Sequence, residues 1–125
     1  MTALTEGRYP GDFLVSEAPG TLSRDNGTVD VPAATTTMEP GTVLGQLSAT
    51  GHWVPYDDAA SDGSEVAAGI LYGPRLENDT GAISSQAATI VTRLAEVRDA
   101  GLIWGAGVDE TAGLAGLAAL FIVAR

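Results

Sequence analysis

The stretch TVLGQLSATGHWVPY, residues 42–56, contains the strongest local fold signal in this chain. Thr42–Leu47 and His52–Tyr56 are short runs with β-branched, aliphatic and aromatic residues, and the turn residues Ala49–Gly51 lie between them. Two such runs joined by a short turn are typical of a β-hairpin. We therefore predict two antiparallel strands here, the first of them opened by Pro40–Gly41.

Further elements are predicted on the C-terminal side of this hairpin. Val66–Tyr72 is a small-residue apolar run, and Phe121–Val123 is a short run that favours a strand. Asp109 is a suitable N-cap for a helix over Thr111–Leu120, because its side chain can accept a hydrogen bond from a backbone amide of the first turn. The pattern predicts a mainly β domain with one short C-terminal helix.

Residues Ala88–Val97 fit two interpretations. Apolar residues recur at helical spacing from Ile90 to Val97, which favours an amphipathic helix. The segment Thr89–Thr92 is β-branched throughout, which favours a strand. The residue pattern leaves both interpretations open.

The first 40 residues differ in composition from the rest. They hold four of the six prolines and little that can pack, apart from Phe13–Val15 beside Tyr9. Proline-rich termini of this kind are typical of extended segments. We predict two parts: an extended N-terminal arm and linker over residues 1–40, and a core domain over residues 41–125.

The charge of the chain limits its class of function. Six basic and sixteen acidic residues give a formal net charge of −10, which does not suit binding to nucleic acid or to an anionic membrane. All six basic residues are arginines, and there is no cysteine, which excludes Schiff-base, disulfide and thiolate chemistry. Thr111–Ala124 is too short to span a membrane, and Met1–Arg8 does not resemble a secretory signal, so a soluble protein is expected.

No catalytic or metal-binding set is recognisable. His52 is the only histidine, and its place on a hairpin strand favours an edge or interface role. The acidic loop Asp57–Glu65 does not fit a calcium loop, because Ala60 and Gly69 would stand at ligand positions. Gly105–Gly107 lacks the third glycine of a dinucleotide loop. We predict a binding or structural module that is not an enzyme and has no cofactor.

Several stretches resemble the head decoration proteins of tailed bacteriophages, the family of phage lambda head decoration protein D. The similarity is carried by Gly41–Gly51, Trp53–Asp57, Ala59–Leu71, Ala95–Val97 and Leu102–Trp104. The closing helix and strand match as well, and Phe13–Glu17 and Gly20–Arg24 are similar to N-terminal segments of lambda-like members. The resemblance covers nearly the whole chain.

The resemblance implies a compact β-clip domain and assigns Ala88–Val97 to a strand. It implies a homotrimer on the outer surface of the expanded head, at three-fold and quasi-three-fold sites. There the protein would bind the major capsid protein and stabilise the shell against internal DNA pressure. It would be made in the host cytoplasm and end in the virion, with no nucleic acid or membrane as partner.

The resemblance also suggests which residues make contacts. The arm is expected to pair as a strand with capsid protein through Tyr9, Pro10, Phe13, Leu14 and Val15. Candidates for trimer or capsid contacts are His52, Trp53 and Trp104. Residues 24–40, with a turn dipeptide at Asn26–Gly27, are expected to form a linker that the lambda protein lacks.

Two other functions are considered. The first alternative is a surface module that would bind a host glycan or another ligand through loops at residues 57–65 and 76–86. The second is a trimeric nucleotide hydrolase. The absence of lysine and of a glycine-rich phosphate loop counts against the hydrolase.

Overall fold

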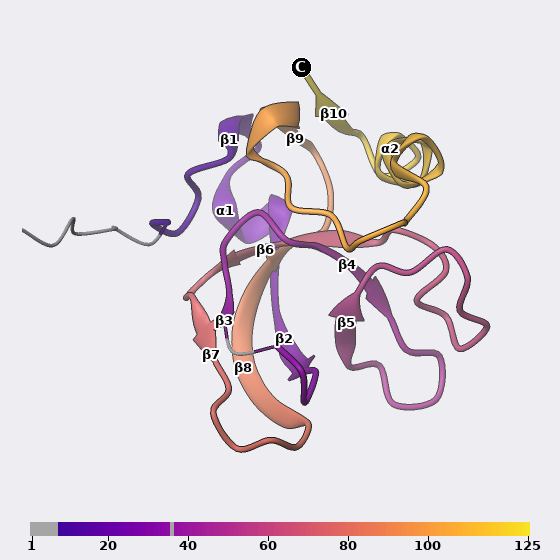
Figure 1. Cartoon of the computed structure of the whole chain (residues 1–125). Coiled ribbons are helices and arrows are strands. Elements are labelled where there is room, and N and C mark those ends of the chain that lie inside the picture. Colours follow the sequence, from indigo (N-terminus) through magenta and orange to yellow (C-terminus); the bar gives the residue numbers. More distant parts are fainter. Residues whose placement is uncertain (1–7, 36) are drawn as a thin grey trace, which may run out of the picture.

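The computed structural model describes residues 8–35 and 37–125 (Figure 1). In these ranges the chain forms β1 (Leu14–Glu17), α1 (Gly20–Ser23), β2 (Arg24–Val31), β3 (Thr37–Met38), β4 (Val43–Gln46), β5 (Trp53–Pro55), β6 (Gly69–Gly73), β7 (Leu76–Glu77), β8 (Ser84–Val91), β9 (Ala95–Val97), a short 3-10 helix (Asp99–Gly101), α2 (Glu110–Ala118) and β10 (Ile122–Ala124). The predicted fold class, mainly β with one short C-terminal helix, is confirmed.

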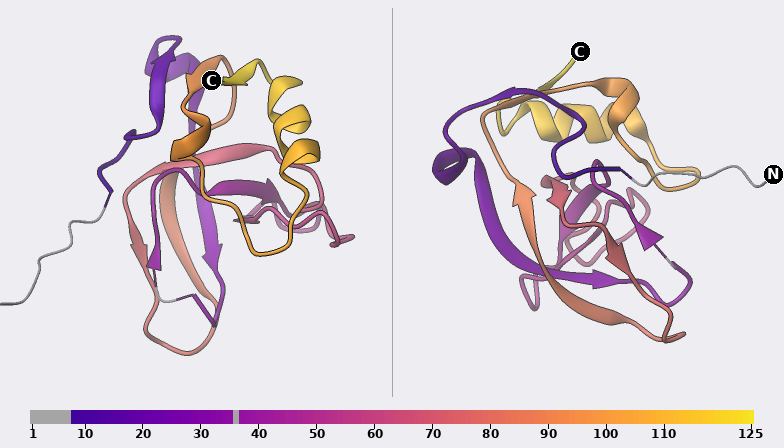
Figure 2. Two further views of the ribbon diagram at one scale, coloured as in Figure 1. Left: turned by 45° about the horizontal axis from the view of Figure 1, so that its top comes forward. Right: turned by 90° about the vertical axis from the view of Figure 1, so that its left-hand side faces the viewer.

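The strands form a closed barrel and a smaller sheet beside it. The barrel runs in the order β2-β5-β4-β6-β8, and the smaller sheet in the order β1-β9-β10. A third, two-stranded sheet pairs β3 with β7. Figure 2 shows α2 and the small sheet together on one end of the barrel. None of the helices in the described ranges is long and apolar enough to cross a membrane.

The predicted hairpin and helix are present. β4 and β5 pair antiparallel, with Leu44 opposite Pro55 and Gln46 opposite Trp53. Asp109 is the N-cap of α2, and its Oδ1 accepts a hydrogen bond from the backbone amide of Ala112 at 3.0 Å. Local turn and capping chemistry therefore act here as the sequence predicts.

The segment Ala88–Val97 is strand rather than helix, but it is not one strand. β8 ends at Val91, and β9 begins at Ala95 in a different sheet. Leu94, in the turn between them, has a left-handed backbone with φ of 56°. The turn lets the chain leave the barrel and enter the small sheet.

The linker predicted for residues 24–40 is corrected by the structure. Within that range, β2 pairs antiparallel with β8 over eight residues, from Arg24 opposite Val91 to Val31 opposite Ser84. Gly27 lies inside this strand and not in a turn. A Cβ at its position would come within 2.9 Å of the Trp53 indole nitrogen. The sequence gives little sign of this strand, because most of its residues are polar. Only Val29 and Val31 are fully buried, on the face that points into the barrel.

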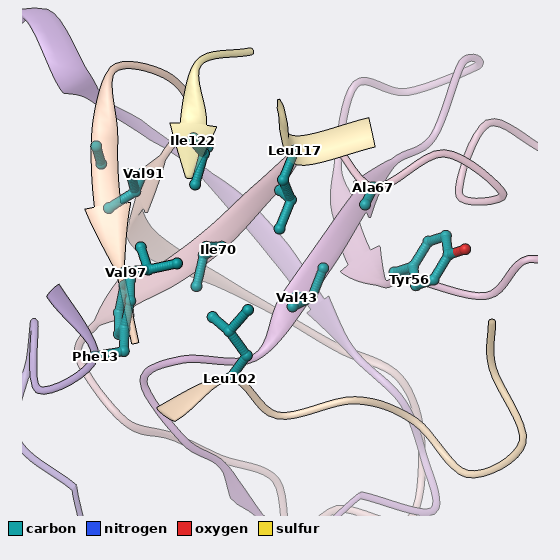
Figure 3. Packing of buried hydrophobic residues seen from close by; sticks show 11 residues of the cluster. Phe13, Val43, Tyr56, Ala67, Ile70, Val91, Val97, Leu102, Leu117 and Ile122 are labelled. Carbon is teal, nitrogen blue, oxygen red and sulfur yellow. The ribbon is translucent and has the colours of Figure 1, made fainter. Parts of the chain in front are cut away.

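Two hydrophobic clusters stabilise these elements. One fills the barrel and includes Val29, Leu44, Trp53, Leu71 and Ile90. The other lies between the barrel, the small sheet and α2 (Figure 3). Its buried members are Phe13, Val43, Tyr56, Ala67, Ile70, Val91, Ala95, Val97, Leu102, Leu117 and Ile122.

Small residues let α2 approach its own domain closely. A Cβ at Gly113 would collide with the Trp104 ring, and a Cβ at Gly116 would come within 3.0 Å of the Ala67 carbonyl oxygen. The small-residue helix therefore packs on its own barrel.

Candidate functional site

The five residues expected to bind capsid lie in a turn and the start of β1. Tyr9 is 59% exposed, Pro10 and Val15 are also exposed, and Leu14 is half-buried. Phe13 is 0% exposed and belongs to the cluster beneath α2 and the small sheet. The structure thus offers Tyr9, Pro10 and Val15 to a partner and uses Phe13 as core.

Backbone hydrogen bonds hold this segment on the domain. The Gly11 amide donates to the Tyr72 carbonyl at 3.1 Å, and the Arg98 amide donates to the Phe13 carbonyl at 2.8 Å. Residues 8–17 are therefore packed on the domain in this structure and do not form a projecting arm. The part of the predicted arm that covers residues 1–7 lies outside the described residues.

An ion pair joins the end of β1 to the start of β2. Glu17 accepts hydrogen bonds from Arg24 Nε at 3.1 Å and from Ser23 Oγ at 2.6 Å, and Arg24 Nη2 forms an ion pair with it. The hydrogen bond from Arg24 lowers the pKa of the Glu17 carboxyl, and the same pairing raises the pKa of Arg24. The Arg24 guanidinium also lies 3.8 Å from the Tyr72 ring centroid, a cation–π contact.

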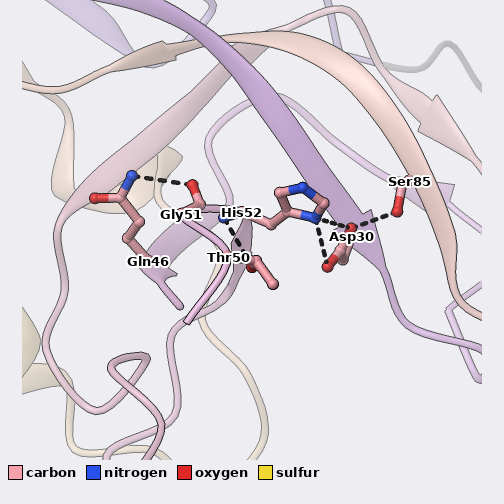
Figure 4. A network of polar contacts seen from close by, with 6 residues as sticks. All are labelled: Asp30, Gln46, Thr50, Gly51, His52 and Ser85. Carbon is pink, nitrogen blue, oxygen red and sulfur yellow. Dashed lines mark hydrogen bonds and ion pairs between the residues drawn. The ribbon is translucent and has the colours of Figure 1, made fainter. Parts of the chain in front are cut away.

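His52 is part of a polar network on the barrel surface (Figure 4). Its Nδ1 lies 2.9 and 3.1 Å from the two carboxylate oxygens of Asp30, and Ser85 Oγ donates to Asp30 at 2.6 Å. A catalytic triad needs the serine to contact the histidine. Here Ser85 and His52 both bind the same carboxylate, so the network joins β2, β8 and the chain before β5 instead.

The two tryptophans that were proposed to contact another subunit or the capsid pack against residues of their own chain. Trp53 is buried in the barrel cluster. Trp104 is half-buried, and its ring packs edge-on against Tyr56, with 5.9 Å between centroids and 75° between planes. The exposed part of Trp104 and the half-exposed His52 are the surface that these candidates offer to a partner.

Carboxylates gather around the loop after β5 and the start of α2. The Asp109 amide donates to Asp58 at 2.9 Å, and the Ser64 amide and hydroxyl both donate to Asp62, which lowers the pKa of Asp62. Burial raises the pKa of Tyr56, and the nearby charges of Asp58, Asp109 and Asp57 raise it further. No ion pair of the described residues involves these aspartates. We call the region around Asp57, Asp58, Asp62 and Asp109 the acidic end.

A hollow of about 780 Å³ adjoins the acidic end. Its walls come from residues 30–34, 47, 54–64, 83 and 105–108, which include parts of the loops at 57–65 and 76–86. Apolar lining residues include Pro32, Val54, Pro55, Ile83 and Val108, and Asp30, Asp57 and Asp62 are the acidic ones. No sequence motif marks this hollow, because its walls meet only when the barrel closes.

A second apolar surface lies on the small sheet. Leu94, Phe121 and Val123 are exposed, and they line a hollow of about 390 Å³ together with residues 16–18. The sequence predicts residues 121–123 as a strand but gives no sign that Phe121 faces outward.

These features define a small β-barrel protein that presents apolar and acidic surfaces, as binding and structural modules do. The family model of the bacteriophage lambda head decoration protein D matches residues 3–122, and the chain belongs to this family. A comparison with curated proteins found no match. Family membership makes the chain a structural protein of a bacteriophage head.

Proposed function

We propose that this protein is a capsid cement protein that assembles as a homotrimer on the outer surface of an expanded tailed-phage head. It sits at three-fold and quasi-three-fold sites, binds the major capsid protein, and stabilises the shell against internal DNA pressure. The observation that carries the proposal is the family match over residues 3–122, which covers the barrel, the N-terminal segment and the small sheet up to the first residue of β10.

The charge distribution supports an outward-facing acidic end. The chain has a net charge of −10, and Asp57, Asp58 and Asp62 form no ion pair among the described residues. Like charge on the outer surface of decorated heads disfavours their association. A trimer that engages three sites at once gains avidity, which compensates for a modest affinity at each site.

The N-terminal segment is proposed to contribute to capsid binding. Tyr9, Pro10 and Val15 are the exposed residues of the predicted set, while Phe13 and Leu14 hold the segment on the domain. An exposed tyrosine is the type of side chain that is enriched in interfaces. His52 and Trp104 remain proposed contacts in the trimer or on the capsid, whereas Trp53 is buried in the barrel cluster.

The direct test is co-sedimentation of the purified protein with undecorated heads, before and after expansion. We expect binding only to expanded heads, saturating at three copies per three-fold site. Binding to neither form would overturn the proposal.

Deletion of residues 1–7 tests the part of the predicted arm that lies outside the described residues. The shortened protein retains Phe13 and β1, so its melting temperature is expected to match that of the full chain. We expect weaker binding to expanded heads. Unchanged binding would remove the first seven residues from the interface. Deletion of residues 1–20 is a poorer test, because it also removes Phe13 from the core.

Ligand binding on the head surface is a second candidate function, favoured by the hollow beside the acidic end. The lining includes Ile83 of one predicted loop and four residues of the other, Asp57, Ala60, Asp62 and Ser64. A glycan array probed with the purified protein tests this candidate. Saturable binding that is lost in Ile83→Asp would support ligand binding. An array without signal would rule out this second candidate and leave capsid binding as the proposed function.

A further inference from the structure

The barrel has a weak seam between β2 and β5. In the described chain these two strands pair, in parallel, through one residue pair, Val29 opposite Trp53. On its other side β2 pairs with β8 over eight residues, and the remaining neighbours in the barrel share two or three residue pairs each. Because each backbone hydrogen bond adds a modest net stabilisation, strand pairing contributes least to barrel closure at this seam.

A side-chain contact spans the seam on the barrel surface. Asp30 belongs to β2, and His52 directly precedes β5. His52 Nδ1 lies 2.9 and 3.1 Å from the two carboxylate oxygens of Asp30. Ser85 of β8 donates to the same carboxylate at 2.6 Å from the other side, as Figure 4 shows. The Asp30 side chain is 16% exposed, so water screens this contact less than it screens a fully exposed ion pair.

Trp53 covers the seam from inside the barrel. Its side chain is buried in the barrel cluster together with Val29. A Cβ at Gly27 would come within 2.9 Å of its indole nitrogen, so the ring lies against the backbone of β2. Separation of the two strands would give water access to this apolar contact, which is unfavourable. Closure of the seam therefore depends on the Trp53 packing inside and on the Asp30–His52 contact outside.

The hollow beside the acidic end lies across the same seam. Asp30 and Pro32, in β2 and just after it, belong to one side of the lining, and Val54 and Pro55 of β5 belong to the other. Because these walls stand on the two strands that meet at the seam, their relative position depends on its closure.

We infer that the Asp30–His52 contact is a latch, which keeps the barrel closed between β2 and β5 and thereby holds the two walls of the hollow together. In the open form that the latch opposes, β5 separates from β2 while the pairing of β2 with β8 stays intact. Parts of a domain that are held by few backbone hydrogen bonds open at a lower free energy than that of global unfolding. The inference goes beyond the proposed function, because it depends on the barrel alone and not on capsid binding.

Amide hydrogen exchange of the full chain, read segment by segment by mass spectrometry, tests the latch. In the wild type we expect the β5 amides to exchange faster than those of β8, because opening of the seam frees β5 and leaves β8 paired. Asp30→Ala removes the latch, and we expect its β5 amides to exchange roughly tenfold faster than those of the wild type.

Asp25→Ala is the matched control. Asp25 is also an aspartate of β2, but it lies opposite Ile90 of β8 and forms an ion pair with Arg93 at 2.6 Å. This ion pair stays intact when the seam opens. Asp25→Ala is therefore expected to leave the exchange of the β5 amides at the wild-type rate, even where the variant lowers the stability of the whole domain.

Three results would overturn the inference. The first is exchange of the wild-type β5 amides that is as slow as that of the β8 amides, since the seam would then open only when the whole domain unfolds. The second is an unchanged rate for the β5 amides in Asp30→Ala. The third is an equal acceleration of the β5 amides in Asp25→Ala. Should Asp30→Ala not fold, His52→Ala removes the other half of the contact and takes its place in the same comparison.

Discussion

The backbone amide of Arg98 donates a hydrogen bond to the carbonyl oxygen of Phe13, with 2.8 Å between the atoms. This bond extends the pairing of β1 with β9 by one position and fixes the Phe13 ring in the second hydrophobic cluster. The segment that looks like a loose arm in the sequence therefore has its largest apolar side chain in the core. Capsid binding by this segment has to use its other residues or to release Phe13.

Replacing Phe13 with alanine tests its role in stability. Truncation of a buried phenylalanine leaves a cavity and lowers the free energy of unfolding by about 3–5 kcal/mol. We expect a clear loss in chemical denaturation. Val15→Ala, an exposed change two residues away, is the control and is expected to shift the free energy by at most about 0.5 kcal/mol. Equal effects of the two changes would place Phe13 outside the core.

The Glu17–Arg24 ion pair predicts a pH-dependent stability. The pKa of Glu17 is lower in the folded than in the unfolded state, so its contribution is present above the unfolded pKa and is lost as the pH falls through the folded pKa. We expect Glu17→Gln to lower the free energy of unfolding by about 1 kcal/mol near pH 7. The stabilities of variant and wild type should then converge as the pH falls below the folded-state pKa of Glu17. A gap that persists in acid would assign the loss to packing.

The control for this series is Glu77→Gln. Glu77 is 71% exposed and lies 3.8 Å from Arg75, and exposed pairs of this kind contribute little. Its pH dependence of stability should follow the wild type.

Gly45 lets the loop after β5 lie against β4. A Cβ at this position would come within 2.6 Å of Ser64 Cα and 2.8 Å of the Ser64 carbonyl oxygen, both backbone atoms that move only with the loop. We expect Gly45→Ala to destabilise the protein by about 1–3 kcal/mol, measured by thermal unfolding. Gly105→Ala is the control, because its nearest atom would lie 3.4 Å away. If both variants melt alike, the close approach does not limit stability.

Asn78 fastens the loop before β8 to the end of β2. Its side-chain nitrogen donates to the carbonyl oxygens of Val31, Pro32 and Ala82 at 3.2, 3.2 and 2.8 Å, and the residue is buried. Asn78→Ala leaves these carbonyls without that donor, and we expect a loss of about 1–3 kcal/mol. The exposed neighbour Asp79 supplies the control, Asp79→Ala. If the backbone amides of this loop exchange as slowly in Asn78→Ala as in the wild type, the Asn78 side chain does not hold the loop in place.

Sequence reasoning succeeded where short-range chemistry controls the backbone. The hairpin of β4 and β5 and the N-cap at Asp109 follow from residues within a few positions of each other. It failed for β2, whose strand depends on β8, and for Phe13, whose burial depends on β9 and α2. The candidate contact residues show the same limit, because burial of Trp53 in the barrel and packing of Trp104 beside α2 depend on residues far away in the sequence.

The sequence by itself determined the class of this protein and its local elements, because charge, strand propensity and capping are properties of neighbouring residues. Family resemblance extended that result to a phage head decoration protein, and the family match over residues 3–122 confirms it. Only the tertiary structure decided that β2 closes the barrel, that Phe13 is core, and that Leu94 and Phe121 present apolar side chains at one end. These features arise from pairing between segments far apart in the chain, and composition and periodicity do not record such pairing.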